Sequence, residues 1–325
     1  MNTYQEILIQ HCKKILGDRR IRNKIVVLCE GQGSILDYKT VANYGKMEQW
    51  HDAYFYRKCV PNTWTTYIPI FFNCKGRSDV IQTYFKLLEL HEEDAQQSYL
   101  NPNKLFAIVD LDLQSQNIDN YHFSNTEEIF LNLYQQGQVN EENAKNHRIW
   151  VTGLIHKEAY FIIPELQEVF NSQINSPMYN CQSVILEDIY ITMADAIIKC
   201  NDLKSNLSTV SNRISHCSGL DCTDLEKLRD SWKEQFENSD EIRKKELIYA
   251  LLMLKKVKVT DKKTKKTKED YWEDIKPPSD WDNTDEVFRD QLLLKIATFY
   301  SQQSNYAKYH IPTFMQFLKH FSTLN

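Results

Sequence analysis

The chain has 325 residues, of which 42% are hydrophobic and 26% are charged, and its formal net charge at pH 7 is −5. This length predicts two domains, or one domain with a large appendage, and the composition is ordinary for a chain that buries a core. No apolar run approaches the roughly 20 residues that span a bilayer, and the amino terminus lacks the apolar segment of a signal peptide. We therefore expect neither a membrane protein nor a secreted one. Because the net charge is −5, any nucleic-acid binding would need a local basic patch.

The eight cysteines are scattered along the chain, and none forms a Cys-x-x-Cys pair. This spacing argues against a zinc ribbon and against a disulfide framework. Because free cysteines are typical of a reducing compartment, we expect a cytoplasmic protein.

The first 160 residues alternate short β-branched or aromatic runs with longer amphipathic ones. This alternation predicts βαβ units, and hence an α/β fold with a mostly parallel sheet flanked by helices. Strands are expected at Lys24–Cys29, Tyr67–Phe72, Leu105–Val109 and Arg148–Thr152. Helices are expected between them at Ser34–Lys58, Ser78–Glu93 and Asn125–Gln136.

The remainder of the chain shows mainly helical patterns, so we expect an α/β domain over residues 1–170 and a mainly helical domain over 171–325. The expected helices are Glu165–Asn171, Val184–Lys204, Asp221–Glu237, Asp240–Lys255, Asp285–Gln303 and Pro312–Thr323. The lysine-rich segment 255–268 is expected to form a small hairpin or a solvated loop. Its lysines are candidate nucleic-acid contacts, namely Lys262, Lys263, Lys265 and Lys266.

Acidic residues stand where two of the apolar strands end. Glu30, followed by Gly31, comes after the first strand, and Asp110 and Asp112 come after the third. In an open parallel sheet, ligands bind outside the carboxyl ends of the strands, so these acids should share one edge. An extended Asp-x-Asp chain would point both carboxylates to one side. A site rich in oxygen and free of sulfur suits Mg²⁺ or Mn²⁺.

These motifs, in this order, resemble those of the Toprim family over residues 24–165. In that family one apolar strand ends in Glu-Gly, as at Glu30 and Gly31, and a later strand ends in Asp-x-Asp. The family aspartate that follows the glutamate is replaced here by Ser34, and the nearest acid is Asp37.

A later segment, IHKEAYFIIPEL, is similar to the Glu-Asn-Tyr-Leu element of stand-alone Toprim proteins related to OLD nucleases. Glu158 and Tyr160 match that element, while Ala159 stands where the family has Asn. The resemblance implies a Mg²⁺-dependent (or Mn²⁺-dependent) endonuclease that hydrolyses phosphodiester bonds in DNA or RNA, with tRNA as one candidate. It implies Glu30, Asp110 and Asp112 as catalytic and metal-binding residues. Glu158 would complete a second metal position, and Lys75, Arg77 and Lys157 would hold the scissile phosphate.

The small Toprim nucleases resemble effectors of bacterial antiphage defence that act beside an ABC-type ATPase. This chain has no G-x-x-x-x-G-K-[ST] sequence, so an ATPase would be a separate partner protein. The partners expected are therefore nucleic acid, an ABC-type ATPase and, for a homodimer, a second copy of the chain. No membrane partner is expected.

Three other functions stay open. A haloacid-dehalogenase-like phosphatase would use Asp110 as nucleophile and Asp112 as general acid and base, although Gln114 stands where it has Thr or Val. A glycosyltransferase with a metal-binding Asp-x-Asp would leave Glu30 without a role. A catalytically idle interaction module would use the helical half to dock an ATPase. Metal-dependent cleavage by the purified protein separates this last alternative from the enzymes.

Overall fold

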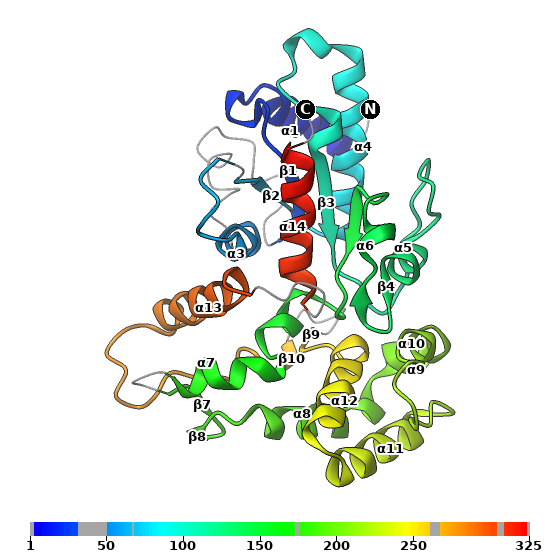
Figure 1. Ribbon diagram of the computed structural model, residues 1–325, viewed down its shortest axis with the longest axis vertical. Coiled ribbons are helices and arrows are strands. Elements are labelled where there is room, and N and C mark those ends of the chain that lie inside the picture. The colour runs from blue at the N-terminus through cyan, green and yellow to red at the C-terminus, as the bar shows by residue number, and fades with distance from the viewer. Residues whose placement is uncertain are drawn as a thin grey trace. The chain divides into compact units, whose positions relative to one another are not determined.

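The structure is a computed structural model, drawn as a ribbon in Figure 1. It describes residues 3–31, 51–66, 68–172, 176–260, 267–303 and 309–323. The helix expected at 34–58 therefore lies partly outside the described residues, and Ser34, Asp37, Lys262, Lys263, Lys265 and Lys266 lie wholly outside them.

The chain divides into two compact units. Unit 1 comprises residues 1–110, 116–152 and 297–325, and unit 2 comprises residues 111–115 and 153–296. No helix in the described part of the chain has both the length and the apolar character needed to cross a membrane.

Unit 1 contains a four-stranded parallel sheet in the order β2-β1-β3-β6. Its strands are β1 (Val26–Glu30), β2 (Ile70–Cys74), β3 (Leu105–Val109) and β6 (Ile149–Val151). Every residue of β3 and β6 is buried, as expected for strands covered on both faces. The predicted α/β class with a parallel sheet is thus confirmed. The second strand begins at Ile70, directly after Pro69, which cannot donate a ladder hydrogen bond; residue 67, where it was expected to begin, lies outside the described residues.

Helices flank this sheet in Figure 1. They are α1 (Thr3–Leu16), α3 (His51–Cys59), α4 (Arg77–Glu93), α5 (Thr126–Leu133), α6 (Glu141–Ala144) and α14 (His310–Thr323). Helix α4 buries Val80, Tyr84 and Leu87, which recur at helical spacing and form one apolar face. Helix α5 ends earlier than expected, since Gln136 and Gly137 adopt positive φ and turn the chain into a hairpin of β4 (Tyr134–Gln135) and β5 (Gln138–Val139).

Unit 2 is mainly helical, as expected for the later part of the chain. Its helices are α7 (Gln167–Asn171), α8 (Leu186–Asp195), α9 (Asn201–Ser205), α10 (Leu207–Arg213), α11 (Leu225–Asn238), α12 (Glu241–Leu254) and most of α13 (Asp285–Ser301). Trp232 stacks on Phe236 with ring centroids 4.6 Å apart, and its indole N–H donates to the Leu247 carbonyl at 2.8 Å. This bond satisfies the indole and ties α11 to α12.

Two hairpins complete unit 2. One pairs β7 (Met178–Tyr179) with β8 (Gln182–Ser183), and the other pairs β9 (Lys258–Thr260) with β10 (Thr267–Asp270). The second lies where a small hairpin or a solvated loop was expected within residues 255–268, and its strand β10 extends to Asp270; the tip lies outside the described residues. Lys255, only 1% exposed, pairs with Glu269 and anchors the base of this hairpin.

The observed division differs from the expected boundary in residues 153–170, which belong to unit 2. The Ile155 N–H donates to the Leu252 carbonyl of α12 at 2.9 Å, and the Tyr160 hydroxyl accepts the N–H groups of Gly153 and Leu154. These bonds turn the chain away from β6 into the helical unit.

The observed division also differs from the expected one at the carboxyl end, because residues 297–325 belong to unit 1 and not to the helical unit. Phe314 and Phe317 of α14 each pack on Trp150, with ring centroids 4.9 Å apart. Phe317 also meets Phe106 at 5.6 Å. The last helix thus completes the core of the sheet unit, a long-range contact that helical periodicity does not reveal.

Candidate metal centre at the carboxyl edge of the sheet

Glu30 and Asp110 lie side by side at the carboxyl edge of the unit 1 sheet. Strands β1 and β3 are parallel neighbours in which Cys29 pairs with Ile108. Glu30 is the last residue of β1, and Asp110 directly follows β3. The Asp110 backbone N–H donates to Glu30 Oε1 at 2.7 Å. A hydrogen bond to a charged acceptor contributes about 1.5–3 kcal/mol, so it orients the Glu30 carboxylate toward the end of β3.

The residue after Glu30 is glycine because the chain there passes against a buried side chain. A Cβ at Gly31 would lie 2.7 Å from both Cγ and Oδ1 of Asn73 and 3.0 Å from Oδ2 of Asp52. Asn73 is fully buried, and its Oδ1 accepts the Ala53 N–H at 2.9 Å and the Cys29 thiol at 3.3 Å. Since Asn73 ties β2 to the first turn of α3, it has little room to move aside for a larger residue.

The same contacts identify an acidic residue that the sequence did not single out. Asp52 lies in the first turn of α3, and the close approach of its Oδ2 to Gly31 brings a third carboxylate to the end of β1. The only signal in the sequence is an acid at the start of a helix, and the helix dipole explains that position without any site. The Toprim-like motif, in which Ser34 replaces the family aspartate and Asp37 is the nearest acid, therefore does not indicate Asp52.

Two predicted phosphate contacts follow β2 at this edge. Lys75 is exposed in the turn between β2 and α4, and Arg77, partly exposed, begins α4. Gly76 caps the helix with extended backbone and no side-chain cap bond. The β2–α4 turn thus brings two basic side chains and the amino end of a 17-residue helix to the edge that carries Glu30.

Asp112 belongs to unit 2, and its surroundings differ from those of Asp110. Its φ is +51°, so the chain is not extended there, and the expectation that an extended Asp-x-Asp points both carboxylates to one side is wrong. The Asp112 N–H donates to the Ile155 carbonyl, and buried Arg213 donates to the Asp112 carbonyl, each at 2.8 Å. The Asp112 carboxylate pairs with Lys256 at 2.5 Å. A metal role for Asp112 stays a prediction.

Glu158 lies in a hydrogen-bonded network of unit 2. His156 Nε2 accepts the Val257 N–H at 2.8 Å, so the ring proton is on Nδ1, which lies 2.8 Å from Glu158 Oε2. The ammonium of Lys157, itself 8% exposed, lies 3.7 Å from Glu158 Oε1. Burial alone would raise the pKa of Glu158, but the Lys157 charge and the His156 hydrogen bond outweigh it and hold that pKa well below its ordinary value.

These contacts give residues 155–166, the segment that is similar to the Glu-Asn-Tyr-Leu element, a structural role within unit 2. Tyr160 caps the turn after β6, and His156 joins the segment to the base of the β9–β10 hairpin. The predicted roles of Glu158 as a metal ligand and of Lys157 as a phosphate contact stay predictions, since each group has the other as a nearby charged partner.

The donor atoms at the unit 1 edge fit a hard divalent cation. The acidic residues at this edge are Glu30, whose carboxylate is held at the end of β3, Asp110, which follows β3, and Asp52, whose carboxylate lies beside Gly31. The described residues contain no group of three or more His, Cys, Asp or Glu side chains arranged to hold a metal ion by themselves. Mg²⁺ does not require one, because it keeps several waters and is bound through one or two carboxylates together with substrate phosphates.

Comparison of the chain with protein-family models, with curated proteins and with solved structures found no match. The function is therefore inferred from the geometry of the residues within the two units.

Proposed function

We propose that the chain is a divalent-metal-dependent endonuclease with a Toprim-like α/β unit. The observation that carries the proposal is the hydrogen bond from the Asp110 N–H to Glu30 Oε1, which joins the acidic ends of two neighbouring parallel strands. Asp52 adds a third carboxylate beside Gly31. The order of the acidic motifs along the chain is also the order of the family that the sequence resembles.

Electrostatics supports a cation at this edge. Negative charges brought to one sheet edge repel one another, and a bound divalent cation would relieve that repulsion. Asp110 would be the main ligand of the ion, and Glu30 and Asp52 would contribute to the same negative field. When bound, a divalent ion would neutralise the charge that develops on a phosphoryl group and would help to generate the attacking hydroxide.

The chain's own residues have distinct proposed tasks. The hydrogen bond from Asp110 fixes the Glu30 carboxylate, which suits Glu30 to accept a proton from the attacking water. Lys75 and Arg77, at the start of α4, would orient the substrate phosphate. A role in antiphage defence beside an ABC-type ATPase, and tRNA as a substrate, follow from the resemblance alone and are part of the proposal on that ground.

Nuclease assays test the proposal. The purified full chain is incubated with plasmid and with total tRNA, in Mg²⁺, in Mn²⁺ and in excess chelator. We expect metal-dependent cleavage of at least one substrate, absent from a Glu30→Gln preparation purified in parallel. Equal cleavage by wild type and Glu30→Gln would identify a contaminant. Absence of cleavage of both substrates would contradict the proposal in favour of an interaction module.

A further inference from the structure

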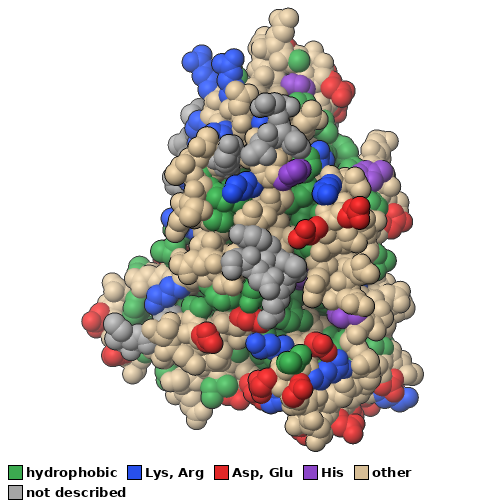
Figure 2. All heavy atoms as spheres, in the orientation of Figure 1, with side chains coloured by type: hydrophobic (Ala, Val, Ile, Leu, Met, Phe, Trp, Pro, Cys, Tyr) green, Lys and Arg blue, Asp and Glu red, His purple; other side chains and the backbone are tan. Residues whose placement is uncertain are grey.

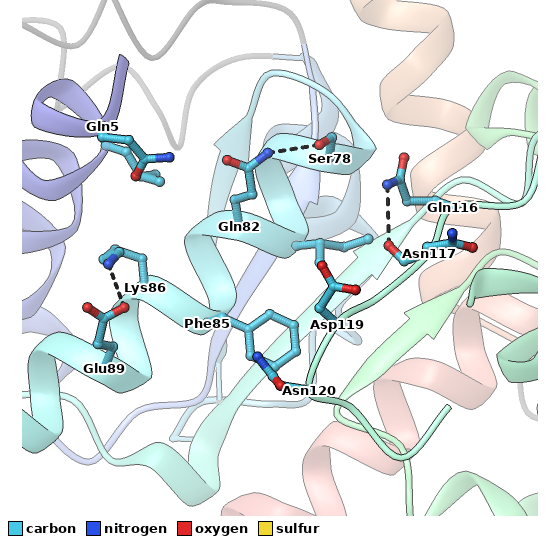
Figure 3. A pocket seen from close by; sticks show the side chains of 12 residues that line it. Gln5, Ser78, Gln82, Phe85, Lys86, Glu89, Gln116, Asn117, Asp119 and Asn120 are labelled. Carbon is cyan, nitrogen blue, oxygen red and sulfur yellow. Dashed lines mark hydrogen bonds and ion pairs between the residues drawn. The ribbon is translucent and has the colours of Figure 1, made fainter. Parts of the chain in front are cut away.

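Unit 1 also contains a pocket of about 390 Å³ away from the acidic residues described above. Figure 3 shows it between α1, α4 and the loop of residues 116–120. Its volume lies within the range of about 300–1,000 Å³ that is typical of small-molecule sites. Two of its walls begin near the carboxyl edge of the sheet, since Ser78 lies in the first turn of α4 and the loop follows β3.

The lining of this pocket is dominated by side-chain amides. They come from three segments of the chain and are Gln5, Gln82, Gln116, Asn117 and Asn120. Each amide offers both a donor and an acceptor. Such groups can read the edge of a nucleobase, which also presents donors and acceptors side by side.

One aromatic ring, that of Phe85, forms part of the wall. Phe85 meets Tyr84 edge-on at 5.3 Å and Tyr121 at 6.2 Å, so its ring is held between two others. The Tyr121 hydroxyl in turn accepts the N–H groups of Arg148 and Ile149, at 3.2 and 3.3 Å. The ring therefore offers a fixed, partly exposed surface on which a base could stack.

The loop that carries Asn117 and Asn120 is held by its own hydrogen bonds. Asn117 and Asn125 form an antiparallel bridge, and the Ile118 N–H donates to the Ser124 carbonyl at 2.8 Å. Asn120 adopts a φ of +60°, a left-handed conformation that asparagine tolerates. The amide side of the pocket is thus largely preformed, which lowers the cost of ordering it around a ligand.

The charges that line the pocket argue against a phosphate as its occupant. Lys86 is ion-paired with Glu89 at 2.5 Å, and the remaining charged lining residue is Asp119. The lining therefore carries a formal charge of −1, from one cation and two carboxylates. A neutral ring with hydrogen-bonding edges fits this environment better than an anion does.

From these observations we infer that the pocket binds one unpaired nucleobase of the substrate strand, with Phe85 as the stacking surface and the amides at the edge of the base. The inference rests on the proposed nuclease function for the identity of the ligand. A base can enter such a pocket only from a single-stranded or flipped-out nucleotide, so the pocket would select unpaired substrate.

The test measures binding of small probes without any cleavage. Adenosine, guanosine, cytidine and uridine are titrated into the full chain in chelator and followed by NMR of the side-chain amides. At least one nucleoside should shift the Gln82 and Asn120 amide signals, with an affinity that does not change with salt because no phosphate is involved. Ribose 5-phosphate, which has the sugar and a phosphate but no base, should not shift them.

Two variants and a control assign the effect to the pocket. Phe85→Leu keeps an apolar residue but removes the ring, and should weaken nucleoside binding about tenfold. Asn120→Gly removes an amide while permitting the positive φ, so it should fold normally and also weaken binding. Phe299→Leu is the control, because Phe299 is also partly exposed, packs edge-on against Tyr300 at 5.3 Å and does not line the pocket. This variant should bind nucleosides like the wild type.

The outcomes separate this inference from the proposed function. Absence of binding by all four nucleosides, equal binding of ribose 5-phosphate, or full binding by Phe85→Leu and Asn120→Gly would each overturn the base pocket, even if the chain cleaves nucleic acid. Pocket-specific nucleoside binding by a chain without nuclease activity would support the pocket and contradict the proposed function.

Discussion

The acidic residues considered as metal ligands have different surroundings in the two units. In unit 2, Asp112 pairs with Lys256 and Glu158 lies between Lys157 and His156, so each carboxylate has a basic partner from the same unit. In unit 1, acids gather at the ends of parallel strands, and the contact that orients Glu30 is a backbone N–H.

For this reason we place the proposed cation at the sheet edge of unit 1. Ion-paired carboxylates are already neutralised and contribute mainly to the stability of their unit. Carboxylates gathered at a strand edge repel one another and so favour a bound ion. On the face drawn in Figure 2, acidic and basic side chains are interspersed, so the contrast concerns local contacts and not the charge of whole surfaces.

The largest expected effect is on cleavage. Glu30→Gln preserves the shape of the side chain and removes its ability to take a proton, so it should lower kcat by about 10²–10⁴-fold while keeping most metal binding. Asp110→Asn should lose both cleavage and metal binding. Plasmid and tRNA cleavage are measured alongside turnover of p-nitrophenyl phosphate. A phosphatase that uses Asp110 would keep its turnover in Glu30→Gln, and that result would favour the rival function.

Acid should destabilise unit 1 before unit 2. Burial lowers the pKa of His11, His147 and His310, all in unit 1, to about 4. Unfolded histidine titrates near 6.5, so between pH 6.5 and 4 the unfolded state binds up to three more protons. The free energy of unfolding should therefore fall by up to about 4 kcal/mol per pH unit. In unit 2 the pKa of one histidine, His216, is lowered by burial.

Hydrogen exchange resolved by peptide checks this order of unfolding. Peptides of the unit 1 strands should lose protection at a higher pH than those of α11 and α12. His310→Gln removes one titrating group and should reduce the slope by about 1.4 kcal/mol per pH unit. If unit 2 lost protection first as the pH falls, the attribution of acid sensitivity to the three buried histidines of unit 1 would be contradicted.

Gly31→Ala tests the close packing beside the proposed metal centre. The added Cβ would lie 2.7 Å from Asn73, so the edge must shift, at a cost of about 1–3 kcal/mol in stability. Cleavage should fall as well, because Gly31 adjoins Glu30. Gly76→Ala is the matched control, since its nearest neighbour is Asp79 Oδ2 at 3.8 Å. A Gly31→Ala urea midpoint equal to that of the wild type would show that Asn73 yields without cost.

The smallest effect is expected from Glu158→Gln in unit 2. The pKa of Glu158 is held below its ordinary value in the folded chain, so its ionised form adds stability at neutral pH. The substitution should cost about 1–2 kcal/mol at pH 7. Below about pH 4.5 the unfolded carboxylate protonates and the difference should shrink by about 1.4 kcal/mol per pH unit. Urea unfolding of both proteins at several pH values measures this, and a difference that grows in acid would contradict the ion-pair network.

The sequence predicted the parallel sheet well because buried strands appear as short apolar runs, and β3 matches its predicted residues 105–109. The adjacent acids were predictable for the same reason, since Glu30 and Asp110 end such runs. Asp52 could not be predicted, because its place beside Gly31 depends on how α3 packs on β2.

The different surroundings of Asp110 and Asp112 could not be predicted from the sequence either. One residue, Leu111, separates them along the chain, yet a positive φ at Asp112 and the hydrogen bond from Arg213 bring the second into the helical unit. Local alternation cannot reveal a bond to a residue a hundred positions later. Long-range contacts of Phe317 with Phe106 and Trp150 likewise place α14 in unit 1.

Metal titration of thermal unfolding tests the central claim most directly. A ligand that binds only the folded chain stabilises it by about 2.7 kcal/mol at 100 times its Kd. Mg²⁺ or Mn²⁺ should raise the melting temperature of wild type and of Glu92→Gln, which removes an exposed carboxylate at the far end of α4. Asp110→Asn should melt at or above the wild-type temperature without metal and show no further rise with it. An equal metal-dependent rise in Asp110→Asn and wild type would contradict a cation site at the carboxyl edge of unit 1.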